Sequence, residues 1–350
     1  MYGLGTSVRN ALYDRGVFRA HDLGARTISI GNITAGGTGK TPLVALVAEI
    51  LAARGETVCI LTRGYGRKNP GRRVLVSDGA LVLADAASGG DEPVELARKL
   101  LGKAVVVSDA DRVSAAAWAR VNFGVTAFVL DDGFQHRRAK RDLDIVCVDA
   151  TDAFGGGEML PAGKLREPLR GLARANAFVV TRSNLVASTD EIRSRLRTAN
   201  AAAPVFTAAS KVSSIMLLGD FLGANAGGNS EGFHPAESAY LFCAIGNPES
   251  LTAQLRKENF DIRGRRAFPD HHAYSQIEIA MVEASAEAAG ARCLLTTGKD
   301  AVKLAGLQLR MPCYVFESTI TLSDRDAFEK LVTSLWPTAL VSRSGKNAPG

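Results

Sequence analysis

The chain has 350 residues, of which 46% are hydrophobic and 22% are charged, and no apolar run is long enough to span a bilayer. This composition is typical of a soluble globular protein, excludes a membrane-spanning one and, at this length, predicts about two domains. The net charge of +6 and the pI near 9.1 predict an anionic partner.

Aromatic residues make up only 6% of the chain, and no stacking platform or recognition-helix motif accompanies the basic residues. A phosphorylated small molecule or an anionic lipid surface therefore fits the charge better, and we expect no nucleic-acid partner. No protein partner can be inferred. The five cysteines lie in apolar, strand-like runs without the spacing of a metal or redox site, so we expect reduced core residues in a cytosolic protein.

The first predicted element is a helix over residues 6–19. Its apolar side carries Val8, Ala11 and Leu12. Arginines are interleaved with these residues, at Arg9, Arg15 and Arg19. The pattern is that of a weak interfacial amphipathic helix. A helix docked on the protein body fits the same residues equally well.

A glycine-rich turn follows a short apolar run in residues 28–47, which read ISIGNITAGGTGKTPLVALV. Such a strand, loop and helix unit cradles phosphate with backbone N–H groups. Lys40 would reach the β- and γ-phosphates of a nucleotide, and the hydroxyl of Thr41 would bind Mg²⁺. The usual pattern has glycine where this chain has Thr34, so the loop must turn through Gly36 and Gly37. The expected nucleotide-binding residues are Thr34, Gly36, Gly37, Thr38, Gly39, Lys40 and Thr41. A glycine turn without a ligand is the structural alternative.

Strand-like runs recur through the first part of the chain, at residues 27–31, 57–62, 104–108, 126–130, 144–148 and 177–181. Helical stretches separate several of them, which predicts a parallel sheet covered by helices on both faces. Ligands of such sheets gather at the carboxyl ends of the strands, so the phosphate loop and nearby acidic residues are expected to converge there.

Two acidic motifs lie in this first part. In FVLDDGFQH, residues 128–136, a buried strand ends in Asp131 and Asp132, a pattern that beside a phosphate loop favours Mg²⁺. An Asp-Asp-Gly turn without a ligand is the alternative. In GDEP, residues 90–93, Asp91 and Glu92 open a helix. Without other context, Asp91 would be a helix cap.

Beyond residue 203 the pattern changes. Residues 205–218 predict one or two extended strands, and residues 223–235, rich in Gly and Asn, predict a mobile connection. Strands at 240–245, 293–297 and 313–317 and a helix at 274–289 predict a second, smaller α/β domain. We therefore expect a nucleotide-binding domain at 1–204, a linker at 205–235, the smaller domain at 236–341 and a frayed tail at 342–350.

The chain resembles the tetraacyldisaccharide 4'-kinases. Eight motifs occur in the order and approximate spacing of that family, over about residues 2–336: GNITAGGTGKTP, LTRGYGRK, GGDEP, LDDGFQHRRAKRDLDIV, LPAGKLREPL, IGNPES, FPDHHAYS and TTGKDAVKL. The resemblance implies a P-loop NTPase-like parallel sheet domain joined by an extended strand to a smaller α/β domain. It also implies ATP-dependent phosphorylation of the 4'-hydroxyl of an acylated glucosamine disaccharide 1-phosphate, a step of lipid A biosynthesis.

The resemblance also implies roles for individual residues. Lys40 and Thr41 would bind nucleotide phosphates and Mg²⁺. Glu92 would join Asp131 and Asp132 around the metal. Asp91 would be the general base, supported by His271 from the second domain, although the adjacent His272 competes for that role. Candidate contacts for substrate phosphate are Arg63, Arg137, Arg138 and Arg166. Because the acyl chains of the substrate lie in the bilayer, we expect a peripheral protein at the cytoplasmic face of the inner membrane.

Three other functions were compatible with parts of the sequence. A GTPase switch is suggested by residues 297–300, but a guanine-reading motif needs Lys two positions before Asp, and here Lys299 directly precedes Asp300. A P-loop kinase of another small acceptor and a nucleic-acid-binding ATPase both share the phosphate loop. Transfer of label to an acceptor would separate them.

Overall fold

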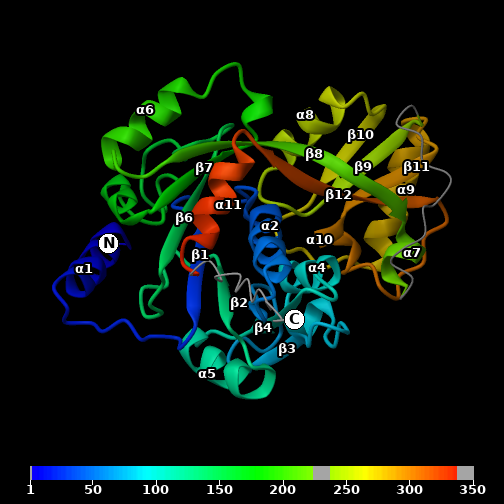
Figure 1. The fold of residues 1–350 in the computed structure, drawn as a ribbon. Helices are drawn as coiled ribbons and strands as arrows, with labels where there is room; N and C mark the ends of the chain where they lie inside the picture. The colour runs from blue at the N-terminus through cyan, green and yellow to red at the C-terminus, as the bar shows by residue number, and fades with distance from the viewer. Residues whose placement is uncertain (1, 224–236, 337–350) are drawn as a thin grey trace, which may run out of the picture.

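The computed structural model describes residues 2–223 and 237–336, which form an α/β fold around one large, mostly parallel sheet (Figure 1). The sheet order is β10-β9-β11-β12-β8-β7-β6-β1-β5-β2-β4-β3. The strands are β1 (Arg26–Gly31), β2 (Val58–Thr62), β3 (Val74–Ser77), β4 (Ala104–Ser108), β5 (Ala127–Asp131), β6 (Leu143–Asp149), β7 (Ala177–Thr181), β8 (Val205–Leu217), β9 (Ala239–Cys243), β10 (Ile262–Ala267), β11 (Cys293–Thr297) and β12 (Cys313–Leu322).

Helices cover the sheet and connect its strands. The α-helices are α1 (Tyr2–Asp14), α2 (Lys40–Ala53), α3 (Ala86–Gly89), α4 (Asp91–Lys99), α5 (Arg112–Phe123), α6 (Asp190–Ala199), α7 (Leu218–Leu222), α8 (Pro248–Lys257), α9 (Gln276–Ala288), α10 (Gly298–Ala301) and α11 (Arg325–Thr333). Two short 3₁₀ helices are η1 (Leu169–Arg174) and η2 (Ser183–Leu185).

The predicted parallel sheet of the first part is confirmed. Strands β7, β6, β1, β5, β2 and β4 run parallel, and every residue of β2, β4, β5, β6 and β7 is buried. Burial on both faces explains why these strands read as continuous apolar runs. The antiparallel edge strand β3 was not predicted, because its four residues follow a run of basic and turn-forming residues.

Strand β8 joins the two parts of the sheet. Its start pairs parallel with β7, where Phe178 faces Val205, and the rest pairs antiparallel with β12 as far as Leu217 opposite Tyr314. The one or two strands predicted at 205–218 are thus one long strand, which crosses between the two halves of Figure 1. Helix α7 follows it within the predicted linker. The predicted connection at 223–235 and tail at 342–350 fall almost wholly or wholly outside the described residues.

The carboxyl-terminal helix α11 follows β12 of the second half in sequence but packs on the first half. It lies beside α2, and its Phe328 and Val332 belong to the same buried cluster as Leu43 and Leu51 of α2 (Figure 1). Hydrogen bonding across β8 is also continuous. The division into domains at residues 204 and 236 therefore stays a prediction.

The amino-terminal helix begins and ends earlier in the chain than the predicted range of 6–19. Helix α1 starts at Tyr2 and ends at Asp14, followed by Gly16 with φ of 72°, so Arg15 and Arg19 lie outside it. A residue in the left-handed region cannot continue a helix, and glycine adopts it without strain. Asn10, which is buried, donates from Nδ2 to Glu167 over 3.1 Å, so the helix is docked on the protein body. Val8 is 51% exposed, and contact of this helix with a membrane stays a prediction.

No helix among the described residues combines the length and the apolar character needed to cross a bilayer. All five cysteines are buried free thiols, as predicted, and none forms a disulfide.

Candidate active site

The candidate site lies where the carboxyl ends of strands from both halves of the sheet face one another. The phosphate loop follows β1, Asp131 ends β5, and Thr181 ends β7. From the other half come the loop after β9, which contains Gly246, the loop after β10, which contains His271, and helix α10 directly after β11, which contains Lys299. The expectation of convergence at one sheet edge is confirmed for the first half, and the second half adds two loops and a short helix.

The backbone of the phosphate loop has hydrogen-bonded carbonyls and free N–H groups. Thr181 Oγ1 donates to the carbonyl oxygen of Thr38 over 2.8 Å, and Arg182 donates to the carbonyl oxygen of Gly37 over 2.8 Å. The backbone N–H groups of residues 36–39 donate to no described residue. Of the two glycines predicted to turn the loop, Gly36 has a φ of 106° and Gly37 has no positive φ, whereas Gly39 has a φ of 73°. Free N–H groups at a helix N-terminus form an anion site.

Lys40 is the first residue of α2, and its ammonium points to polar oxygens. Nζ lies 3.0 Å from Asn32 Oδ1 and 3.4 Å from Asp132 Oδ1. Burial alone would lower the pKa of Lys40, but the charge of Asp132 raises it above the ordinary value. Both guanidinium NH groups of Arg166 donate to the two oxygens of Asp132 over 2.8 Å. Although burial opposes it, the charges of Lys40 and Arg166 hold the pKa of Asp132 well below its usual range.

Asp131 differs from its neighbour because its carboxylate has no partner. The residue is only 4% exposed, and no described residue donates a hydrogen bond to its side chain or forms an ion pair with it. Burial, together with the charges of Glu92 and Asp132, raises the pKa of Asp131 to about 7. A buried carboxylate of this kind is stabilised by a cation.

The donors predicted to bind Mg²⁺ are of a suitable chemical kind. Thr41, Glu92, Asp131 and Asp132 offer only hard oxygen ligands. In the described part of the chain, however, no three acidic, His or Cys side chains are arranged as a metal site, and Glu92 is engaged by Lys299 at 2.7 Å. The orphaned carboxylate of Asp131 supports a cation here, and the Mg²⁺ site stays a prediction.

Asp91 and His271 are brought together from opposite halves of the chain. Nδ1 of His271 lies 2.9 and 3.0 Å from the two oxygens of Asp91, which is 4% exposed. The hydrogen bond with Asp91 raises the pKa of His271. Burial alone would raise the pKa of Asp91, but the bond from His271 and the charge of Lys299 lower it. The contact therefore favours the ionised carboxylate of Asp91 and the protonated form of His271.

The alternatives left open for these residues are distinguished by geometry. The N-cap of α4 is Gly90, with φ of 97°, and Asp91 is the first helical residue. Oδ1 of Asp91 accepts the backbone N–H of Glu92 over 2.9 Å, so Asp91 supports the start of the helix and also contacts His271. His272 turns away, with Nε2 lying 3.0 Å from Glu278 of α9. Of the two adjacent histidines, only His271 contacts Asp91.

A basic pocket of about 220 Å³ opens beside this pair. It is lined by Arg9, Arg63, Tyr65, Arg112, Asp132, Gln135, His136 and Arg166. The ring of Tyr65 stacks on that of His271 with 6.3 Å between centroids, which connects the pocket to the Asp91 pair. Arg137 and Arg138 do not line it, because Arg137 bonds to Asp14 of α1 and Arg138 pairs with Asp111.

Proteins similar to this chain match nearly its whole length. A family profile described as tetraacyldisaccharide-1-P 4'-kinase matches residues 1–336. The tetraacyldisaccharide 4'-kinase of Geobacter metallireducens is 39% identical over 312 residues, covering 89% of this chain and 88% of its own. That of Syntrophus aciditrophicus is 36% identical over 345 residues, covering 95% and 90%.

The chain belongs to the tetraacyldisaccharide 4'-kinase family. A crystal structure described as the apo form of LpxK from Aquifex aeolicus in complex with ATP has a TM-score of 0.72 at 28% identity, and covers 96% of both chains. The resemblance inferred from eight motifs is thereby confirmed.

Several residues of the site were not predicted from the sequence of this tetraacyldisaccharide 4'-kinase family member. Tyr65, Arg112 and His136 line the pocket, and Lys299 and Lys303 approach Glu92 and Asp91 from the second half. All but Arg112 lie within the eight motifs, so motif membership was the available signal. Arg112 lies outside them, and only its burial against the carbonyl of Asp131 marks it.

Proposed function

We propose that this chain transfers the γ-phosphoryl group of ATP to the 4'-hydroxyl of tetraacyldisaccharide 1-phosphate in lipid A biosynthesis. The observation that carries the proposal is the meeting of three features at one sheet edge: the lysine loop, the Asp91–His271 pair and a basic pocket. Family membership supports the acceptor, and the ATP complex of the Aquifex relative supports the donor.

Phosphoryl transfer depends mainly on alignment and on neutralising charge, because its transition state is loose. The free N–H groups of residues 36–39 and the ammonium of Lys40 would hold the β- and γ-phosphates. Mg²⁺, when bound by Thr41, Asp131, Asp132 and Glu92, would neutralise the developing charge. Lys299 must then release Glu92, or share it.

Asp91 would accept the proton of the attacking hydroxyl. Its lowered pKa keeps it ionised, and the contact with Nδ1 of His271 fixes its orientation. The two residues come from different halves of the chain, so the base is assembled only when the halves meet. Such assembly limits wasteful transfer to water when no lipid is bound.

The two-part organisation belongs to the same proposal. We infer a P-loop NTPase-like part at residues 1–204 and a smaller α/β part at 236–341, joined through β8. The guanidinium groups of Arg63 and Arg166 face the pocket and suit a phosphorylated disaccharide.

Work on a bilayer-embedded acceptor requires contact with the membrane surface. We propose peripheral binding at the cytoplasmic face of the inner membrane, with the exposed side of α1 as one contact. Sedimentation with anionic vesicles tests this placement, and protein that stays in the supernatant at low and physiological salt contradicts it.

The activity is tested with γ-labelled ATP and purified protein in three parallel mixtures: with tetraacyldisaccharide 1-phosphate, without acceptor, and with DNA. We expect label in the glycolipid and little hydrolysis in the other two mixtures. Hydrolysis stimulated by DNA, or label that never enters the glycolipid, contradicts the proposal.

A further inference from the structure

Two lysines of the TTGKDAVKL motif lie between the candidate site and the second half of the sheet. Lys299 Nζ is 2.7 Å from Glu92 and 2.8 Å from Asp270. Lys303 Nζ is 2.8 Å from Asp300 and 3.6 Å from Asp91. Each ammonium thus joins one carboxylate at the start of α4 to one carboxylate of the second half.

Both lysines are buried, and neither contacts a nucleotide-binding residue of the phosphate loop. The side chains of Lys299 and Lys303 are 10% and 7% exposed. Burying an ammonium costs several kcal/mol unless it is paired, and apolar residues would dock α10 on α4 without that cost. Placement of the charged partners is a function that apolar residues could not supply.

Lys303 has a rigid anchor. Its partner Asp300 is fully buried, and accepts hydrogen bonds from the backbone N–H of Ala244, the hydroxyl of Tyr274 and Oγ1 of Thr297. Asp300, fixed by three donors, gives Lys303 an ion-pair partner in a fixed place, although the buried ammonium donates no hydrogen bond to any described residue. Its charge lies 3.6 Å from Asp91 and can therefore attract the carboxylate of Asp91 toward one position.

Lys299 acts on His271, the other member of the Asp91–His271 pair. The Asp270 oxygen that it contacts also accepts the backbone N–H of His271 over 3.1 Å. His271 has a φ of 60°, a conformation that a non-glycine residue holds only when its surroundings impose it. The Lys299–Asp270 contact is one such constraint.

We propose that Lys299 and Lys303 are positioning residues for phosphoryl transfer: Lys303 places Asp91, and Lys299 places His271 through Asp270. The proposal rests on the proposed role of Asp91 as general base. Both lysines are inferred to act through the Asp91–His271 pair, and Lys299 also holds Glu92, one of the residues predicted to bind Mg²⁺.

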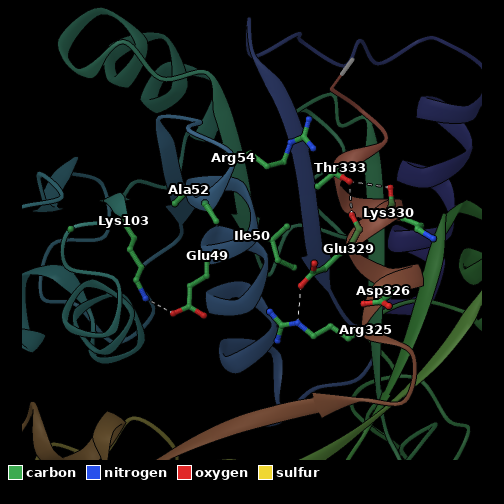
Figure 2. Close-up of a pocket in the computed structure, with 12 residues that line it drawn as sticks. Glu49, Ile50, Ala52, Arg54, Lys103, Arg325, Asp326, Glu329, Lys330 and Thr333 are labelled. Atoms are coloured by element: carbon green, nitrogen blue, oxygen red, sulfur yellow. Dashed lines mark hydrogen bonds and ion pairs between the residues drawn. The ribbon is translucent and has the colours of Figure 1, made fainter. Parts of the chain in front are cut away.

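The first test is Lys303→Met in the full chain. We expect kcat to fall about tenfold to hundredfold, because small displacements of a catalytic group have effects of that size, while the KM for ATP changes by less than about twofold. The matched control is Lys103→Met. Lys103 pairs with Glu49 of α2 at 2.7 Å, and both line a groove that α11 also borders (Figure 2). Glu49 lies about two and a half helical turns beyond Lys40 on α2. This control should keep normal kcat.

A double-mutant cycle with Asp91→Asn separates positioning from a structural role. If Lys303 acts through Asp91, adding Lys303→Met to Asp91→Asn lowers kcat by less than about twofold more. Effects that multiply overturn the proposal, as does Lys303→Met with normal kcat. Normal kcat in Asp91→Asn alone instead contradicts the base assignment, so the two failures are distinguishable.

Thermal unfolding of each variant checks the fold. If Lys303→Met does not fold, the same cycle with Lys299→Met replaces it, since Lys299 is less deeply enclosed and its partners Glu92 and Asp270 are partly exposed. Lys299→Arg should restore most of the activity by keeping the charge. Equal loss in Lys299→Met and Lys299→Arg, or multiplying effects with Asp91→Asn, overturns the proposal by this route.

Discussion

Asp91 and His271 are 180 positions apart in the chain, yet Nδ1 of the histidine lies 2.9 Å from Oδ1 of the aspartate. One residue starts α4 in the first half, and the other follows β10 in the second. The contact therefore reports directly on how the two halves meet, and it is the most informative place to test the site.

We expect His271→Gln to lower kcat about tenfold to hundredfold. A hydrogen bond to a charged group contributes about 1.5–3 kcal/mol, which corresponds to that range of rate. The matched control is His272→Gln, whose native side chain pairs with Glu278 of the capping box at the start of α9. The control should lower the unfolding temperature and leave kcat nearly unchanged. Equal losses of kcat in steady-state assays would contradict the assignment of His271.

Lys40→Ala should reduce turnover at least as much as Asp91→Asn. Lys40 would neutralise charge that develops on the phosphates, whereas proton removal contributes less to a loose transition state. Labelled ATP and acceptor lipid at saturating concentration measure both variants. Near-normal turnover in Lys40→Ala would show that the loop is not the nucleotide site.

Gly246→Ala should weaken nucleotide binding by about tenfold or more. A Cβ at Gly246 would lie 2.4 Å from the backbone nitrogen of Gly37, closer than any real contact, so the loop after β9 must move away from the phosphate loop. Gly219→Ala is the control, because a Cβ there meets no atom within 4 Å. Calorimetric titration with a non-hydrolysable ATP analogue measures both. Unchanged affinity in Gly246→Ala would mean that this contact is not needed for binding.

Glu95→Gln should make the free energy of unfolding less dependent on pH. Burial, reinforced by the charge of Glu92, raises the pKa of Glu95 from 4.5 to about 8. Between these values the unfolded chain has released the proton that the folded chain retains, so the stability of the native protein falls as pH rises. The variant lacks this loss and should gain stability on the order of a few kcal/mol relative to the native protein by pH 8.5.

Urea unfolding at pH 5, 7 and 8.5 measures the effect of Glu95→Gln. Glu49→Gln is the control, because Glu49 is exposed and paired with Lys103. A stability difference between Glu95→Gln and the native chain that is the same at all three pH values would contradict the burial of an uncharged carboxyl at this position.

Much of the fold followed from local pattern. The strand-like runs at 104–108, 177–181 and 293–297 match β4, β7 and β11 residue for residue, because buried parallel strands are continuous apolar runs bounded by turn residues. Strand β10 was missed, since its sequence IRGRRA contains three arginines and has little apolar content. The predicted end of α1 was five residues too late. The prediction followed the spacing of arginines as far as Arg19, but the left-handed conformation of Gly16 ends the helix earlier.

The functional groups of the site could be predicted from short sequence motifs. A glycine turn ending in Lys40 and Thr41, and a strand ending in Asp131 and Asp132, can be recognised without a structure because each function needs residue types at fixed local spacing. Those motifs also carried the family resemblance.

Partnership within the site was decided by the tertiary structure alone. Sequence could not separate His271 from His272, nor say that Arg63 and Arg166 line the pocket while Arg137 and Arg138 bind elsewhere. Nor could it join Glu92 to Lys299 across 207 positions. Local spacing encodes the backbone conformation of a segment, whereas the pairing of charges depends on how the loops after β9, β10 and β11 pack against α4 and the phosphate loop. That packing is a property of the whole folded chain.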